Sequence, residues 1–135
     1  MKILIIDDER SIRNSLKEIL VDEGYDVDLA ENGSQGCAMV DKEKYSVIFC
    51  DIKMPEMDGM EVLDRFNQMG IDAAVVMISG HGDIAVAVEC IKKGAFDFIP
   101  KPLDLNRILI TIKNATEKVS IAKETKILKK KVQGQ

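Results

Sequence analysis

Residues 3–8, Ile-Leu-Ile-Ile-Asp-Asp, are the stretch that decides the fold, because a short apolar run ends abruptly in two carboxylates. A run that is continuously apolar and rich in β-branched residues is typical of a parallel strand covered on both faces. Short apolar runs recur along the chain, and three of the five are continuously apolar. The predicted strands are residues 3–6, 27–30, 47–50, 73–78 and 95–99.

Segments with helical spacing separate these runs. In the first segment, Ser11 or Asp8 could cap the helix and Gly24 could close it. The fourth segment carries Ile84, Val86, Val88 and Ile91 before Gly94. The other segments lie at about 34–42, at 60–69 and from about 104 onward. Strands alternating with helices predict an α/β fold, a single five-stranded parallel sheet that is doubly wound, with helices on both faces. The pattern does not reveal the strand order.

The composition fits one globular domain. The chain has 135 residues, 46% of them hydrophobic and 31% charged. This length excludes a multidomain enzyme, and no apolar run reaches the roughly 18 residues of a membrane span. Acidic residues follow only four apolar ones near the N-terminus, which is far short of the apolar segment of a secretory signal, so we expect a cytoplasmic protein. Cys37, Cys50 and Cys90 match no zinc or redox spacing and are interpreted as small buried apolar residues.

The charge is unevenly distributed along the chain. The net charge is -4, but residues 113–135 hold seven lysines against two glutamates, which leaves an excess of acidic groups in residues 1–112. We therefore divide the chain into a domain over 1–115 and a helical extension over 116–135. Three interpretations of the basic extension stay open: a solvated helix face, a nucleic-acid-binding segment, and a helix that joins the domain to another one. The absence of aromatic residues disfavours direct nucleic-acid contact.

Polar residues follow four of the five predicted strands. They are Asp7 and Asp8 after the first strand, Asp51 after the third, Ser79 after the fourth and Lys101 after the fifth. Each alone could be a turn, cap or loop residue. Together they stand at the same place relative to four strands, and the carboxyl ends of parallel strands are where such sheets bind ligands.

The residue types at this edge indicate a particular chemistry. Carboxylates that are forced together repel one another unless a cation neutralises them, and hard oxygen ligands suit Mg²⁺. Beside the metal, one carboxylate could attack a phosphoryl group while an ammonium and a hydroxyl stabilise the phosphoryl oxygens. The sequence thus predicts a magnesium-dependent phosphoryl-transfer site.

With these residues in view, the chain resembles the receiver domain of two-component response regulators over residues 1 to about 115. The segments that carry the resemblance are Ile5-Ile6-Asp7-Asp8-Glu9, Asp51-Ile52-Lys53-Met54-Pro55, Met57-Asp58-Gly59, Ile78-Ser79-Gly80 and Lys101-Pro102. The resemblance implies the flavodoxin-like strand order 2-1-3-4-5. It also implies that the Lys101–Pro102 peptide bond is cis.

The resemblance implies a role for each site residue. Asp51 would accept a phosphoryl group from a sensor histidine kinase. Mg²⁺ would be bound by Asp8 and Asp51 directly, by Asp7 largely through water, and by the backbone carbonyl of Lys53. Two further residues, Ser79 and Lys101, would contact the phosphoryl group.

Phe98 matches the family's aromatic switch residue, although it lacks the hydroxyl of a tyrosine. Ser79 stands where threonine is also common, and both supply a hydroxyl group. His81 is either an ordinary loop residue or, with Lys53, lines the mouth through which water reaches the phosphorylated carboxylate.

The segments Ile-Ser-Gly-His-Gly (78–82) and Gly-Ala-Phe-Asp-Phe-Ile-Pro-Lys-Pro (94–102) resemble receivers of the nitrogen-regulatory class. The next domain in that class is usually an ATPase that acts on sigma-54 polymerase. The implied partners are a sensor histidine kinase, an output domain in cis that controls transcription, and a second copy of the chain. The homodimer would form through the fourth helix, fifth strand and fifth helix, through the C-terminal helix, or through both, with no role for a membrane or for direct nucleic-acid contact.

Two other functions compete with the phosphorylated receiver. A small aspartate-nucleophile phosphatase would use the same metal and carboxylates, but it needs a second Asp two residues after Asp51, where Lys53 stands. A receiver-like module could instead dimerise without phosphorylation. The receiver itself would not be a turnover enzyme, since it would catalyse only its own phosphorylation and dephosphorylation.

Overall fold

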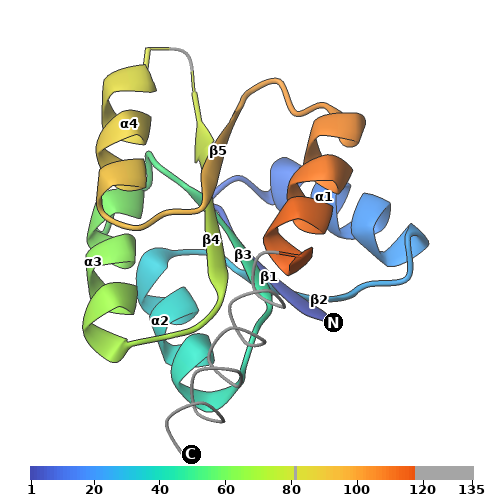
Figure 1. The fold of residues 1–135 in the computed structure, drawn as a ribbon, viewed down its shortest axis with the longest axis horizontal. Helices are drawn as coiled ribbons and strands as arrows, with labels where there is room; N and C mark the ends of the chain where they lie inside the picture. Colours follow the sequence, from blue (N-terminus) through green and yellow to red (C-terminus); the bar gives the residue numbers. More distant parts are fainter. Residues whose placement is uncertain (81, 118–135) are drawn as a thin grey trace, which may run out of the picture.

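The structure, a computed structural model, describes residues 1–80 and 82–117. Its five strands form one parallel sheet in the order β2-β1-β3-β4-β5, which confirms the predicted fold and strand order (Figure 1). The strands are β1 (Lys2–Ile6), β2 (Asp26–Ala30), β3 (Val47–Asp51), β4 (Ala74–Ser79) and β5 (Asp97–Pro100). β5 begins two residues later than predicted.

Helices cover both faces of the sheet (Figure 1). On one face lie α2 (Gly33–Lys42), α3 (Gly59–Met69) and α4 (Ile84–Lys92); on the other lie α1 (Arg10–Asp22) and a final helical segment over residues 105–117. Residues 116 and 117 continue that helix, and the rest of the predicted C-terminal extension lies outside the described residues. Among the described helices, none is long and apolar enough to cross a membrane.

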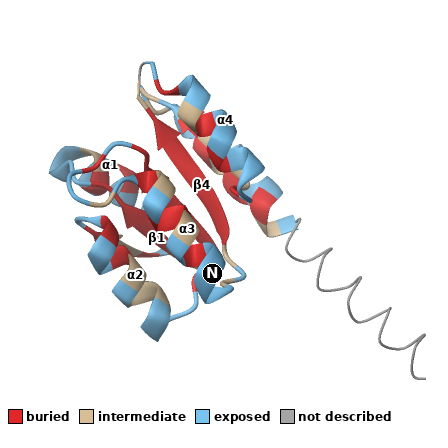
Figure 2. Cartoon of the chain, turned by 90° about the vertical axis from the view of Figure 1, so that its left-hand side faces the viewer, coloured by how far each residue is buried: buried red, intermediate tan, exposed pale blue. Residues whose placement is uncertain are grey.

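The hydrophobic core consists of two layers separated by the sheet. Leu4 and Ile6 of β1 face the α2, α3 and α4 side, whereas Ile3 and Ile5 face α1 and the final helical segment. Side chains alternate between the two faces of a strand, so the interior positions of a strand buried on both faces are all apolar. Figure 2 shows the result, with buried strands between helices whose outer faces are exposed.

The predicted cap of α1 was wrong. Its N-cap residue is Glu9, whose side chain makes no capping hydrogen bond. Neither Ser11 nor Asp8 takes that place, because Ser11 already lies inside the helix and Asp8 lies before the cap. At the other end, Gly24 adopts a left-handed conformation with φ 91° just beyond the helix, as the sequence predicted.

The apolar residues of α4 divide between the core and the surface. Ala87 and Cys90 are the buried residues of this helix, and Val86 is half-buried against the core. In contrast, Ile84, Val88 and Ile91 are 66%, 42% and 38% exposed. The small side chains of Ala87 and Cys90 allow the helix to pack closely on the sheet. Three of the four larger β-branched side chains face outward.

The three cysteines are free in the described structure. Cys50 and Cys90 are buried and Cys37 is half-buried, which agrees with the interpretation that they are apolar packing residues. Burial raises the pKa of all three thiols.

Candidate functional site

The carboxyl ends of β1 and β3 bring three acidic side chains together. β1 and β3 are neighbours in the sheet, with Ile6 opposite Cys50, so the residues that follow them meet at one edge. Carboxylate oxygens of Asp7, Asp8 and Asp51 all lie within 4.8 Å of one another. Asp7 and Asp51 are buried and Asp8 is exposed.

Asp7 is held in an unfavourable electrostatic environment. Its Oδ1 accepts a hydrogen bond from the Glu9 N–H at 2.8 Å, but its buried Oδ2 has no partner in the described structure. Burial, together with the charges of Asp51 and Asp8, raises the pKa of Asp7 to about 6, against the opposing effects of the Glu9 N–H and Lys101. Burial also raises the pKa of Asp51, although Lys101 opposes that shift.

These carboxylates fit a hard divalent cation. An unpartnered buried oxygen is costly unless something binds it, and here two more carboxylates stand beside it. A set made only of oxygens, with one exposed member that leaves room for water, suits Mg²⁺.

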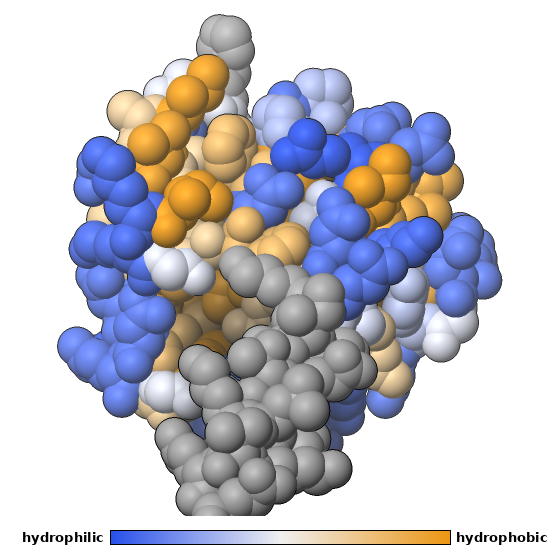
Figure 3. Space-filling view, in the orientation of Figure 1, coloured by the Kyte–Doolittle hydropathy of each residue, from blue (hydrophilic) through white to orange (hydrophobic). Residues whose placement is uncertain are grey.

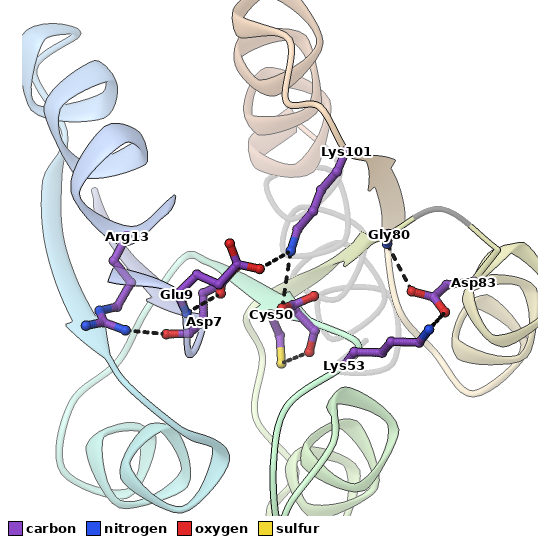
Figure 4. A network of polar contacts seen from close by, with 9 residues as sticks. Asp7, Glu9, Arg13, Cys50, Lys53, Gly80, Asp83 and Lys101 are labelled. Carbon is purple, nitrogen blue, oxygen red and sulfur yellow. Dashed lines mark hydrogen bonds and ion pairs between the residues drawn. The ribbon is translucent and has the colours of Figure 1, made fainter. Parts of the chain in front are cut away.

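Lys101 follows β5 and reaches over the acidic cluster. Its Nζ lies 3.4 Å from Asp51 Oδ2 and 3.5 Å from Glu9 Oε1 (Figure 4). Partial burial lowers the pKa of Lys101, but the neighbouring carboxylates outweigh this effect and the net shift is upward, so the ammonium stays charged. The Lys101–Pro102 peptide bond is cis, as the resemblance implied, and the Lys101 N–H donates to the Ser79 carbonyl at 2.8 Å.

The other predicted site residues lie around this centre. Ser79 is the buried last residue of β4, and Phe98 is a half-buried residue of β5 packed against the core on the α2, α3 and α4 side. The Lys53 ammonium points away from the cluster and pairs with Asp83 at 3.1 Å. His81 lies outside the described residues.

Gly59 sets the distance between α3 and the phosphoacceptor candidate. A Cβ at this position would lie 2.5 Å from the Asp51 carbonyl oxygen and 2.7 Å from the Ile52 Cα, where no side chain fits. The Gly59 N–H instead donates to the Ile52 carbonyl at 2.7 Å. The first turn of α3 therefore packs directly against the end of β3.

Asp83 is a residue that sequence reasoning missed. It is 4% exposed, and its Oδ2 accepts the Gly80 N–H at 3.1 Å while its Oδ1 meets Lys53. These contacts tie the loop after β4 to the loop after β3. In the sequence, the one feature that pointed to Asp83 was its position as an acidic residue immediately before a predicted helix.

Arg13 was missed as well. It lies on the buried side of α1, and its Nη1 donates to the Asp7 carbonyl at 2.8 Å. In the sequence, the one feature that pointed to Arg13 was its position three residues before Leu16, which places a charged residue within the apolar stripe of the helix.

The chain was compared with known families and proteins. A family model described as the response regulator receiver domain matches residues 3–113. An NtrX-like response regulator of Rickettsia bellii is 38% identical over 132 residues, which cover 96% of this chain and 28% of that protein. The chemotaxis protein CheY of Listeria monocytogenes is 38% identical over 118 residues, covering 87% of this chain and 99% of CheY.

Solved structures agree with these relatives. The receiver domain of NtrX from Brucella abortus superposes with a TM-score of 0.81 at 37% identity, covering 85% of this chain and 98% of that one. A response regulator receiver domain protein from Clostridium thermocellum gives a TM-score of 0.86 at 32% identity, covering 90% and 98%. The chain spans less than a third of the length of the NtrX-like relatives.

Proposed function

Because the chain belongs to the response regulator receiver family, we propose that it is a phosphorylation-activated receiver with Asp51 as the phosphoryl acceptor. The NtrX-type relatives confirm the resemblance to the nitrogen-regulatory class. One observation carries the assignment of Asp51. Its carboxylate belongs to the three-carboxylate cluster and also lies 3.4 Å from the Lys101 ammonium.

The contacts of the three carboxylates favour Asp51 over its neighbours as the nucleophile. Asp7 already uses one oxygen to accept the Glu9 N–H, and its other oxygen is buried. Asp8 is exposed. Asp51 has the Lys101 ammonium beside its carboxylate, and this charge can stabilise the phosphoryl oxygens as the new bond forms.

The residues that would hold Mg²⁺ are Asp7, Asp8, Asp51 and the backbone carbonyl of Lys53. When bound, Mg²⁺ would neutralise the carboxylates and stabilise negative charge on the phosphoryl oxygens. Two residues of the chain would contact the phosphoryl group itself. Ser79 would donate its hydroxyl to the phosphoryl group, and Lys101 would pair with it.

Ser79 and Phe98 would transmit the modification to the surface. They lie on the neighbouring strands β4 and β5, and the Lys101 N–H links the end of β5 to the Ser79 carbonyl. A phosphoryl group shifts the population of two states only if it contacts them differently, and Ser79 is the residue placed to provide that difference. The affected surface would comprise α4, β5 and residues 105–117.

The exposed side chains of α4 support a role for this surface in association. Figure 3 shows apolar side chains gathered over α4, and Ile84, Val88 and Ile91 are its exposed apolar residues. Their spacing places them on one side of the helix. We propose that they contribute to a homodimer, together with the helical extension that the sequence predicts over 116–135, most of which lies outside the described residues.

The phosphoryl donor would be a sensor histidine kinase, and the response would pass to an output domain in cis, in the cytoplasm. The NtrX-type relatives are more than three times as long as this chain, which supports an attached output domain. We propose that this domain regulates transcription with sigma-54 polymerase. Receiver domains are signalling modules and not classical enzymes. The proposed influence of His81 and Lys53 on the lifetime of the phosphorylated state stays a prediction.

Incubation of the chain with acetyl phosphate and Mg²⁺ tests the proposal. We expect one labile phosphoryl group per chain, none with EDTA, and none in Asp51→Asn. Asp64→Asn, which removes an exposed carboxylate of α3 outside the site, is the matched control and should be phosphorylated normally. An unchanged yield in Asp51→Asn would overturn the assignment. Steady release of phosphate from a phosphomonoester would instead support the phosphatase.

A further inference from the structure

Arg13 is a buried cation beside the acidic cluster. Only 8% of the residue is exposed. A buried guanidinium is costly unless hydrogen bonds replace its water, so its partners identify what it stabilises. Nη1 donates to the Asp7 carbonyl at 2.8 Å, whereas Nη2 lies 3.9 Å from a Glu31 carboxylate that is 71% exposed. The Asp7 carbonyl is therefore the main partner, because an exposed ion pair contributes little.

That carbonyl belongs to the peptide group that joins Asp7 to Asp8. In an extended chain, consecutive side chains point in opposite directions. The Asp7 and Asp8 carboxylates nevertheless both reach within 4.8 Å of Asp51. The chain must turn between them, and the orientation of this one peptide group determines where the two carboxylates lie relative to each other.

Two contacts hold the turn. On one side the Asp7 Oδ1 accepts the Glu9 N–H, and on the other Arg13 holds the Asp7 carbonyl. The α1 N-terminus contributes no side-chain cap that could take over this task, since the Glu9 side chain makes no capping bond. In Figure 4, Arg13 lies on the opposite side of Asp7 from Lys101, so it is not placed to touch a phosphoryl group on Asp51.

We infer that Arg13 is a positioning residue for the magnesium site: by holding the Asp7–Asp8 peptide group, it pre-orients both carboxylates for the cation. The inference rests on the proposed function, because it assumes that these carboxylates bind Mg²⁺. Groups that orient metal ligands typically change metal affinity by roughly 10–100-fold when they are removed. Arg13 contacts the backbone between the two ligands and not the ligating carboxylates themselves, so the lower end of that range applies.

Calorimetric titration of the chain with Mg²⁺ tests the inference. In Arg13→Met the dissociation constant should rise about tenfold. Lys17→Met is the matched control, because it also removes one positive charge from α1 but from an exposed position. Its dissociation constant should stay within about twofold of wild type, the change expected from a distant screened charge.

A purely structural role for Arg13 makes a different prediction. It would lower the stability of the metal-free chain, yet the folded molecules would bind Mg²⁺ with the wild-type dissociation constant, and that result would overturn the inference. If Arg13→Met does not fold, Arg13→Lys takes its place, since it keeps the charge and the apolar stem but its side chain ends one atom short of the Nη1 that reaches the Asp7 carbonyl. A weakened dissociation constant in Arg13→Lys supports the inference, and a wild-type value overturns it.

The wild-type titration separates this inference from the proposed function. If the wild-type chain fails to bind Mg²⁺ at millimolar concentration, the proposed magnesium site is wrong and the inference fails with it. If the wild type binds and Arg13→Met binds equally well, only the role of Arg13 is wrong.

Discussion

At the scale of single residues, the buried carboxylate of Asp7 lowers the stability of the metal-free chain at neutral pH. Its pKa of about 6 in the folded chain exceeds the ordinary Asp value of about 3.9, so the native state binds more protons than the unfolded state between these pH values. The free energy of unfolding of the metal-free chain therefore falls as the pH rises through that range. Above about pH 6 the full penalty of a buried, ionised Asp7 is present.

We therefore expect Asp7→Asn to stabilise the metal-free chain at neutral pH. The amide keeps an oxygen that can accept the Glu9 N–H, but it carries no charge. Urea unfolding in EDTA should show a gain of about 1–3 kcal/mol near pH 7, and this gain should shrink toward pH 4. The same variant should lose Mg²⁺ binding. A variant less stable than wild type near pH 7 would contradict this account of Asp7.

Glu56 has a strained backbone conformation. Its φ is 67°, a region that favours glycine, and it forms the centre of a tight turn in which the Met57 N–H donates to the Pro55 carbonyl at 2.7 Å. Glu56→Gly should raise the free energy of unfolding by about 0.5–1 kcal/mol, because glycine adopts positive φ without steric cost.

Glu23→Gly is the control for this change, since Glu23 is also exposed but has φ -84°. At position 23 glycine relieves no backbone strain in the native state and only makes the unfolded chain more flexible, so we expect the free energy of unfolding to fall. Equal effects of the two substitutions, measured by urea unfolding, would show that Glu56 is not strained.

Which site residues could be predicted depended on where they lie. Asp51, Ser79 and Lys101 follow apolar runs directly, so their positions relative to the sheet were readable. Arg13 and Asp83 were not, because their importance comes from burial and from partners distant in sequence or on the backbone. Nothing in a string of residues shows that the Arg13 guanidinium meets the Asp7 carbonyl.

At the scale of elements, α4 is tied at its two ends by different contacts. At the start, Asp83 joins the Gly80 N–H and Lys53. At the other end, the Asn67 Nδ2 of α3 donates to the Lys93 carbonyl at 2.7 Å, and the Lys93 ammonium lies 3.1 Å from Asp64. α4 thus packs on the sheet through the small residues Ala87 and Cys90 along its length, while polar contacts hold it at both ends.

Asp83→Ala should loosen the start of α4. The Asp83 carboxylate is buried and accepts a backbone N–H, so its loss should cost about 1–3 kcal/mol of stability. Lys53→Met removes the other half of the ion pair, but the Lys53 side chain is 75% exposed, so we expect a change below about 0.5 kcal/mol. Hydrogen exchange of the Ala87 amide should accelerate in Asp83→Ala alone. Equal effects of both substitutions would mean that the ion pair, not the backbone contact, holds the helix.

The helices also show the limits of sequence patterns. Hydrophobic spacing located α4, but it did not show that Ala87 and Cys90 would be its buried residues while Ile84 and Val88 are exposed. A pattern of apolar residues marks every hydrophobic position and does not tell a core face from a face that binds another molecule. The outward-facing apolar side of α4 was therefore not predictable from the spacing.

At the scale of the whole molecule, alternating strands and helices were enough to predict an α/β sheet with two helical layers. The strand order was not contained in that periodicity, because any parallel order yields the same alternation. It came from the resemblance carried by Asp7, Asp8, Asp51 and Lys101, and the structure confirms it. The proposed division at residue 115 remains a prediction.

The proposed homodimer gives a prediction at this scale. Ile84→Lys places a charge within the exposed apolar stripe of α4 and should weaken self-association of the chain treated with beryllofluoride and Mg²⁺, measured by sedimentation equilibrium. Met69→Lys, at an exposed apolar residue of α3, should leave association unchanged. Association that is insensitive to Ile84→Lys would place the interface elsewhere. Dimerisation that is equally strong without the phosphoryl mimic would favour the phosphorylation-independent module.

The central claim is that Asp51 receives the phosphoryl group, and the most direct test is to locate that group. After reaction with acetyl phosphate and Mg²⁺, borohydride reduces an acyl phosphate to an alcohol, and peptide mass spectrometry then identifies the modified residue. We predict modification at position 51 alone, in the peptide that contains the end of β3. Modification at Asp7 or Asp8 with an unmodified Asp51 would contradict the account.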